Sequence, residues 1–265
     1  MSVLNKNLLV LGLVLLVIGV TRAGFAADQA YSIKDLRALA DQRAWSELAS
    51  HLEDIRPADR GPEWNTLLEQ TATGLLEEGS QAQDAYGSLS NSEGMFKRYP
   101  KLKGSKPFMA KRAEVGLKAF NACFQDGYGA DQCLQELTSF VRNDGDNLDL
   151  AFKAGKLTRR NAKHWAAAPF FADALVKPGA ERRCDDEDVA LAVMSGLSLP
   201  ASGYERFLGA SVKLASELCW PILKGPLREQ IASNGEYFRE NTCAIFKTNK
   251  ALEGEVANVC RKYQK

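Results

Sequence analysis

Residues 184–219 read CDDEDVALAVMSGLSLPASGYERFLGASVKLASELC, with a cysteine at each end and a proline turn between them. Apolar residues recur at helical spacing over 186–197, which predicts a helix with one apolar side. Leu199-Pro200-Ala201 predicts a turn, and Ser202 with Glu205 predicts a capping box at the start of a returning helix that reaches Cys219. The stretch therefore predicts an antiparallel helical hairpin closed by its terminal cysteines.

The other cysteines repeat this arrangement. Antiparallel helices joined by a short turn bring residues equidistant from the turn side by side. Midpoints of neighbouring cysteines fall at Tyr128 in a glycine turn, between Ala201 and Ser202 in the proline turn, and just before Gly254. Six cysteines allow fifteen pairings, and the sequence alone does not choose among them. We expect sequence neighbours to pair: Cys123 with Cys133, Cys184 with Cys219, and Cys243 with Cys260.

These cysteines have the pattern of structural disulfides. Metal ligation or redox catalysis would call for a Cys-x-x-Cys pair or a tight Cys/His cluster, and the sequence has neither. Each bridge would contribute on the order of 2 to 4 kcal/mol to stability.

The N-terminus predicts an export signal. Residues 1–7 carry one positive charge at Lys6, residues 8–20 are an uncharged apolar run, and Gly24-Phe25-Ala26 offers a cleavage site. The run is short for a membrane span, so we expect cleavage near Ala27 and no stable span afterwards. Export agrees with disulfide formation, and the lack of an Asn-x-Ser/Thr sequon favours the bacterial periplasm over secretion.

Composition indicates an ordinary globular chain. Hydrophobic residues make up 45% of the 265 residues, and the formal net charge is +1. Removing residues 1–26 would take away Lys6 and Arg22 and no acid, leaving a charge near zero. Neither the charge balance nor any motif points to nucleic acid as a partner.

Apolar spacing is helical along most of the mature chain. Ser32 and Asp35 predict a capping box, and Pro62 and Ser105 each suit the start of a further helix. Residues 80–94 are polar and small, which predicts a loop. No segment alternates β-branched residues between hairpin turns, so strands are not expected.

Residues 147–180 resemble one unit of a tetratricopeptide repeat. Ala154-Gly155 stand where the first helix has its small residues, Phe171 where the second has its packing aromatic, and Pro178 where the unit closes. Two departures are Pro169 inside the second helix and the missing large aromatic near Ala151. The resemblance implies antiparallel helices in close approach, with the aromatic between neighbouring repeats.

Together these patterns predict an all-α fold of stacked antiparallel hairpins, an α-solenoid of tetratricopeptide-like type with a C-terminal part held by disulfides. The expected organisation is a signal peptide over 1–26, an N-terminal helical block with a loop and a basic linker over 27–104, and a disulfide-linked block over 105–265.

Catalytic and cofactor motifs are scarce. The two histidines, His51 and His164, belong to no zinc helix, and no nucleophile elbow or phosphate-binding glycine loop occurs. Glu47 and His51 could meet a metal from one helix face, but a solvated pair explains them as well. The acids at 185–188 suit a helix N-terminus, where the helix dipole favours negative charge. We therefore expect no metal, no cofactor and no catalytic residue.

One segment is strongly basic against the neutral background. Residues 96–112 contain seven cations and no acid, interleaved with Phe96, Tyr99 and Phe108. The segment could bind a polyanion such as an anionic envelope polymer, or it could be a solvated linker anchored by its aromatics. The candidate binding residues are Lys97, Arg98, Lys101, Lys103, Lys106, Lys111 and Arg112.

The sequence favours an exported, non-catalytic helical scaffold that binds a protein or peptide, with Trp165, Arg159 and Arg160 as possible contacts. Two alternatives stay open. One is a cell-envelope enzyme with a cleft between the helical blocks that contains His51, and the other is a membrane-tethered structural component that keeps residues 8–20.

Overall fold

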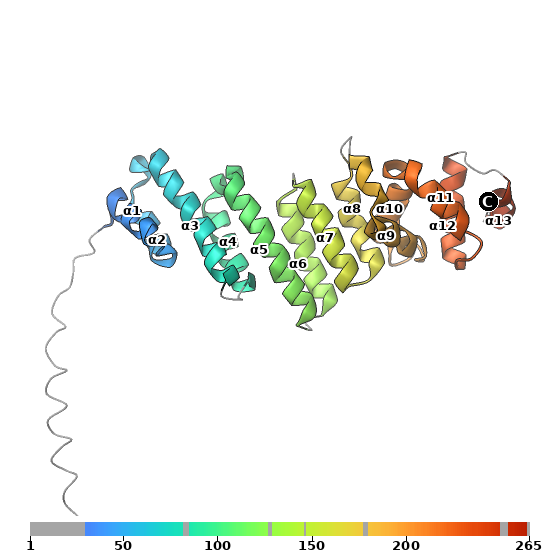
Figure 1. Cartoon of the computed structure of the whole chain (residues 1–265), viewed down its shortest axis with the longest axis horizontal. Helices are drawn as coiled ribbons and strands as arrows, with labels where there is room; N and C mark the ends of the chain where they lie inside the picture. Colours follow the sequence, from blue (N-terminus) through green and yellow to red (C-terminus); the bar gives the residue numbers. More distant parts are fainter. Residues whose placement is uncertain are drawn as a thin grey trace, which may run out of the picture. The chain divides into compact units, whose positions relative to one another are not determined.

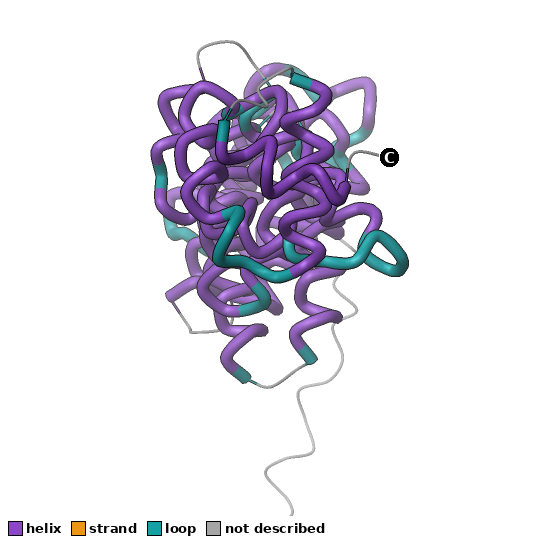
Figure 2. Tube along the Cα trace, turned by 90° about the vertical axis from the view of Figure 1, so that its right-hand side faces the viewer, coloured by secondary structure: helices purple, strands orange, loops and turns teal. Residues whose placement is uncertain are grey.

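The computed structural model describes residues 30–81, 85–126, 129–145, 147–176, 180–249 and 254–263. Within these ranges the regular structure is entirely helical, which confirms the all-α prediction (Figure 2). The chain divides into two compact units at Thr71, inside α3 (Pro62–Gln81). We call the described residues up to Thr71 unit 1 and those from Ala72 unit 2. The expected boundary between 104 and 105 falls inside unit 2.

Unit 1 is a short helical cluster. Its elements are α1 (Ile33–Asp41), α2 (Trp45–His51), η1 (Leu52–Asp54), η2 (Pro57–Asp59) and the first half of α3. The Ser32 capping box forms as predicted, because the Ser32 hydroxyl accepts from the Asp35 N–H and the Asp35 carboxylate accepts from Ser32 N–H at 2.8 Å. Trp64 is buried and donates from Nε1 to the Leu52 carbonyl at 3.0 Å.

Unit 2 begins with helices that pack on their neighbours in sequence (Figure 1). They are α4 (Ala85–Arg98), η3 (Pro100–Gly104), α5 (Lys106–Gln125), α6 (Ala130–Asn143) and α7 (Leu148–Asn161). The loop expected over 80–94 is wrong, since α4 occupies most of it. Ser88 and Ser92 are buried, and such small residues let α4 approach α5 closely.

The second half of unit 2 is also helical. It comprises η4 (His164–Ala167), α8 (Ala168–Ala174), η5 (Ala180–Asp185), α9 (Glu187–Leu197), α10 (Glu205–Lys213), the π-helical segment η6 (Leu214–Leu218), α11 (Trp220–Gln230), α12 (Glu236–Thr248), α13 (Glu255–Cys260) and η7 (Arg261–Tyr263). Helices α9 and α10 form in the predicted stretch and pack against each other. The capping box at Ser202 is wrong, because Tyr204 is the N-cap residue and makes no side-chain cap bond.

The repeat-like segment 147–180 contains the expected close approach. Phe171 of α8 packs on α7 at Gly155, where an added Cβ would lie 2.7 Å from the Phe171 ring. Pro169 stands in the first turn of α8, after the 3-10 turn η4, so it interrupts no α-helix. Pro178 lies outside the described residues.

All three predicted disulfides are present, with Cα–Cα distances of 6.0 Å for Cys123–Cys133 and 5.4 Å for both Cys184–Cys219 and Cys243–Cys260. The Cys184–Cys219 bridge joins η5, which precedes α9, to the residue that follows η6 after α10. Residues 250–253, between the third pair, and Tyr128, the midpoint of the first, lie outside the described residues.

No helix among the described residues has the length and apolar character needed to cross a membrane. The predicted signal peptide lies outside the described residues. Disulfide bonds fit a protein exported from the reducing cytosol.

Candidate binding groove

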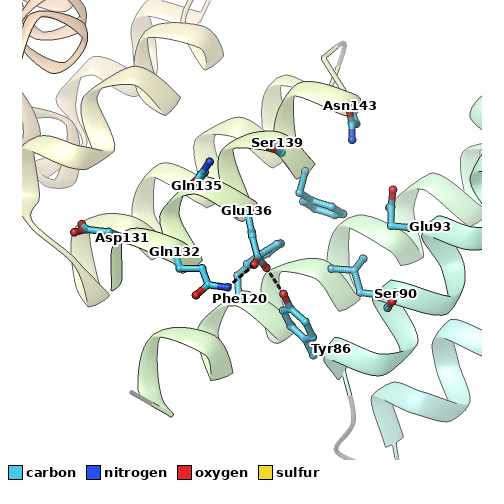
Figure 3. A pocket seen from close by; sticks show the side chains of 12 residues that line it. Tyr86, Ser90, Glu93, Phe120, Asp131, Gln132, Gln135, Glu136, Ser139 and Asn143 are labelled. Atoms are coloured by element: carbon cyan, nitrogen blue, oxygen red, sulfur yellow. Dashed lines mark hydrogen bonds between the residues drawn. The ribbon is translucent and has the colours of Figure 1, made fainter. Parts of the chain in front are cut away.

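A groove of about 780 Å³ lies in unit 2 between α4 and α6, over α5 (Figure 3). Its floor is apolar. Leu89 of α4, Phe120 of α5 and Phe140 of α6 line it and are buried. The Phe120 and Phe140 rings lie 5.5 Å apart between centroids. Gly116 permits this packing, because a Cβ there would clash with the Phe140 ring.

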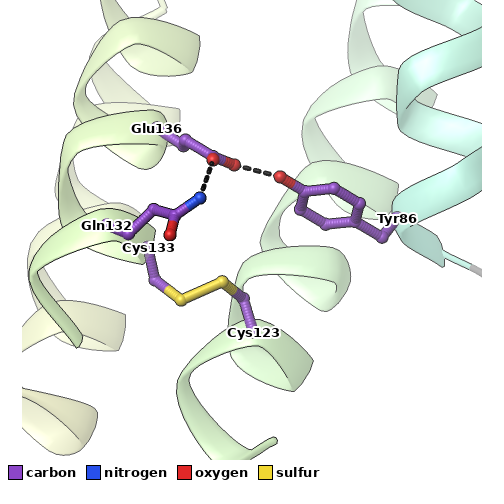
Figure 4. The surroundings of a disulfide bond; sticks show 5 residues. All are labelled: Tyr86, Cys123, Gln132, Cys133 and Glu136. Carbon is purple, nitrogen blue, oxygen red and sulfur yellow. Dashed lines mark hydrogen bonds between the residues drawn. A yellow bond between two sulfur atoms is a disulfide. The ribbon is translucent and has the colours of Figure 1, made fainter. Parts of the chain in front are cut away.

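Tyr86 forms one end of the groove. Its side chain is 47% exposed, while its ring meets Phe120 edge-on with centroids 6.5 Å apart. The Tyr86 hydroxyl donates to Glu136, which also accepts from the Gln132 amide at 3.1 Å (Figure 4). The adjacent Cys123–Cys133 disulfide ties the last turn of α5 to the first turn of α6. This end of the groove is thus held by a covalent bond between α5 and α6 and by a hydrogen bond between α4 and α6.

Arg112 lies beneath the other end. Its side chain is fully buried, and Nε donates to Glu93 Oε1 at 2.5 Å. The guanidinium carbon stands 4.3 Å from the centroid of the Phe140 ring and 5.1 Å from that of Phe96. Nη1 has no hydrogen-bond partner among the described residues, and the cation–π contacts offset part of the cost of burying the charge.

The two walls of the groove run in the same direction. Tyr86, near the start of α4, bonds to Glu136 of α6. Farther along both helices, Arg112 contacts Glu93 of α4 and Phe140 of α6. The intervening α5 packs against α4, α6 and α7. The groove is therefore bounded by α4 and α6, which run parallel, with α5 between them.

The cations of the basic segment expected to bind anions differ in their exposure. Five of its cations are exposed: Lys97, Arg98, Lys101, Lys103 and Lys106. Lys111 pairs with Glu114 at 3.0 Å, and this hydrogen bond helps to hold the pKa of Glu114 below its usual value. Arg112 is buried and paired, so its inclusion in an accessible anion-binding set was wrong. Phe96 stacks on Phe108, which anchors the segment to the core.

The residues considered for catalysis are engaged within unit 1. His51 stacks on Tyr31 with ring centroids 3.7 Å apart, and its Nδ1 lies 2.9 Å from Asp54 Oδ2. The hydrogen bond from His51 lowers the pKa of Asp54. Glu47 accepts from the Tyr31 hydroxyl at 3.3 Å. The described residues contain no group of three His, Cys, Asp or Glu side chains placed to hold a metal ion.

The acids at the start of α9 face cations of α7. Lys156 Nζ lies 2.7 Å from Asp186 Oδ2 and 3.4 Å from Asp188 Oδ2, and Arg159 also pairs with Asp188. Asp186 is the N-cap residue of α9. Trp165 packs edge-on against Phe207 and Tyr204, with centroids 4.6 and 5.3 Å apart. Arg159 and Trp165 thus have intramolecular roles.

Sequence reasoning missed the groove because it treated residues 80–94 as a loop. A signal was available, since Ala85, Leu89, Ser92 and Phe96 recur at spacings of three and four residues, which is helical. Comparison with known proteins gives no further guide, because no protein family, curated protein or solved structure matches this chain.

Proposed function

We propose that this protein is an exported, non-catalytic α-helical scaffold that binds a protein or peptide partner in the α4–α6 groove. The observation that carries the proposal is the groove itself, an open apolar floor between polar walls, with the half-exposed Tyr86 at one end. Recognition grooves for peptides commonly combine apolar anchors with a polar rim, and tyrosine is enriched among residues that dominate binding energy.

The proposed architecture is a stack of antiparallel hairpins, α4 with α5 and α6 with α7, of tetratricopeptide-like type. In such stacks the first helices of consecutive hairpins line one face, where partners bind. The parallel course of α4 and α6 supports this arrangement, as does the close packing of Phe171 on Gly155. The groove then occupies the position expected of a binding surface.

We propose the bacterial periplasm as the location, after removal of residues 1–26. The three disulfides and the signal-like N-terminal sequence support export. N-terminal sequencing of the mature chain distinguishes this from a retained tether, because cleavage near Ala27 removes the apolar run.

Site-specific photo-crosslinking tests the scaffold proposal. A benzophenone amino acid replaces Gln135, which is exposed and lines the groove, and in matched controls it replaces Ile222 or Tyr237, which are exposed elsewhere in unit 2. Illumination in the intact envelope should yield a polypeptide adduct from position 135 and not from the controls. Equal adducts from all three positions, or none from position 135, would contradict the proposal.

Measuring the affinity of the purified partner then tests whether the partner that forms the adduct binds in the groove. The crosslinked partner, once purified, should bind the unmodified protein and lose affinity for Ser139→Trp, because the indole would fill space above the groove floor. Ser233→Trp, an exposed position outside the groove lining, is the matched control. Retention of full affinity by Ser139→Trp would place the partner elsewhere.

A second candidate function is binding to an anionic envelope polymer. The observation that favours it is the run of five exposed cations from the end of α4 to the start of α5. Clustered positive charge attracts polyanions with a strong dependence on salt.

A further inference from the structure

We propose that the partner segment bound in the α4–α6 groove is cationic, with a lysine or arginine at the Tyr86 end and an apolar side chain on the groove floor. This inference rests on the proposed function and specifies the chemistry of the partner. Its basis is the charge of the lining, which contains Glu93, Asp131 and Glu136 and no Lys, Arg or His.

The negative charge is concentrated at the Tyr86 end. Glu93 is compensated by the buried Arg112, so it adds little net charge to its end of the groove. At the other end, the Glu136 carboxylate accepts two hydrogen bonds, but both come from neutral groups, the Tyr86 hydroxyl and the Gln132 amide. Asp131 is exposed and forms no hydrogen bond or ion pair with the described residues. Glu136 and Asp131 thus both line the groove without a paired cation among the described residues, and Figure 3 shows the Glu136 carboxylate at Tyr86 and Asp131 farther away, at the start of α6.

Helix capping accounts for only part of this arrangement. Asp131 stands in the first turn of α6, where the helix dipole favours an acid. Glu136 lies in the second turn, and its carboxylate is held beside Tyr86 across the groove instead of toward the helix start. The dipole thus explains the presence of Asp131 but not the position of Glu136.

The shape of this end suits a long cationic side chain. The exposed ring of Tyr86 offers a face for the aliphatic stem of a lysine or the plane of a guanidinium, and the Glu136 carboxylate lies next to it. The neighbouring floor of Phe120, Phe140 and Leu89 accepts an apolar side chain of the same segment. A cationic, amphipathic polypeptide segment matches both surfaces, and an acidic segment would meet repulsion at Asp131 and Glu136.

Two synthetic peptides test the inference with the intact mature protein. Both are fluorescent 12-residue peptides with blocked ends and the same leucine and phenylalanine positions, and their polar positions are all lysine in one and all glutamate in the other. Fluorescence anisotropy should show binding of the lysine peptide alone. Asp131→Lys should weaken it about tenfold, since the change replaces an attraction with a repulsion. Glu240→Lys, an exposed acid outside the groove with the same change in charge, should alter it less than twofold.

Failure of this inference is distinguishable from failure of the proposed function. Lack of binding by the lysine peptide, equal binding of the glutamate peptide, or equal effects of Asp131→Lys and Glu240→Lys would overturn the cationic assignment. If photo-adducts from position 135 still formed and mapped to acidic segments of a partner, the scaffold proposal would stand with a different ligand chemistry. If position 135 gave no specific adduct, both would fall.

Discussion

The ring of Phe171 lies directly over the backbone of Gly155, so that helices α7 and α8 touch where one of them has no side chain. Both residues are in the core of unit 2, and Phe171 also meets Phe152 edge-on with centroids 5.2 Å apart. A close-packed interior has little room for added atoms, so a substitution at this contact is a sensitive test of the fold.

Gly155→Ala should destabilise the protein by about 1 to 3 kcal/mol, because the new methyl group overlaps the Phe171 ring. Gly209→Ala is the matched control, since Gly209 also lies inside a helix, α10, and has no atom near the position of an added Cβ. That change should be neutral or stabilise by up to about 1 kcal/mol, through helix propensity. Urea unfolding followed by circular dichroism measures both, and equal midpoints would show that the close approach is absent.

Arg112→Met should lower the free energy of unfolding by about 3 kcal/mol, because it leaves Glu93 three-quarters buried without its partner. The double variant Arg112→Met with Glu93→Met should recover most of the loss, since no unpaired charge remains. Arg98→Met, at an exposed site on α4, should change stability by less than about 0.5 kcal/mol. Additive effects of the Arg112 and Glu93 changes would contradict the observed pair.

Removal of the three disulfides should cost unequal amounts of stability. Their sequence separations are 10, 35 and 17 residues, so loop-closure entropy predicts losses of about 3 kcal/mol for Cys123–Cys133 and Cys243–Cys260 and about 4 kcal/mol for Cys184–Cys219. Thermal unfolding of variants in which both cysteines of one bridge are replaced by alanine measures which bridge contributes most to stability. A smallest effect for the Cys184–Cys219 pair would exclude the entropic explanation.

Acid should weaken the contact between α7 and α9. Burial alone would raise the pKa of Asp186, but the hydrogen bond from Lys156 and that from the Asp188 N–H lower it on balance. A lowered folded-state pKa stabilises the protein above the unfolded value of about 3.9, and this stability is lost as the pH falls through the folded pKa.

The unfolding temperature should therefore drop between about pH 5 and pH 3, and Lys156→Met should reduce the size of that drop. Lys213→Met, which removes an exposed charge in α10, should leave the pH dependence unchanged. Identical pH profiles for the protein and Lys156→Met would show that this ion pair does not govern acid stability.

Charge reversal at Lys101 and Lys103 tests the polyanion candidate. Both residues are exposed on η3, so Lys101→Glu with Lys103→Glu should abolish salt-sensitive binding to heparin or dextran sulfate. Lys213→Glu with Lys247→Glu provides an equal change in charge elsewhere. Unchanged binding in the first variant would dismiss this surface.

The sequence predicted the helices best where periodicity and turn chemistry agreed. For α9 and α10 the apolar spacing and the proline turn gave the correct elements although the cap expected at Ser202 was wrong, and the pairing expected for the cysteines at the two ends of this stretch is present. Helix α4 escaped prediction because its serines and glycines are weak helix formers and favour loops. Their burial against α5, which holds the helix in place, is a tertiary effect that local composition does not record.

The burial of Arg112 was also not predicted from the sequence. Position 112 lies on the same helical stripe as Phe108, Val115 and Ala119, which indicates burial, yet its charge suggested a surface site. Two aromatic rings and Glu93 from other helices supply the environment that makes burial possible. The helical spacing could have predicted α4 itself, but not the groove, because its walls meet through residues as distant in sequence as Tyr86 and Glu136.

The three bridges join consecutive cysteines and never interleave. In a chain threaded through a translocon from its N-terminus, each thiol would therefore meet its native partner before the following pair emerged. Oxidation in order of arrival would yield the correct connectivity, so an oxidase alone should suffice and no isomerase would be needed to reshuffle mismatched sulfurs.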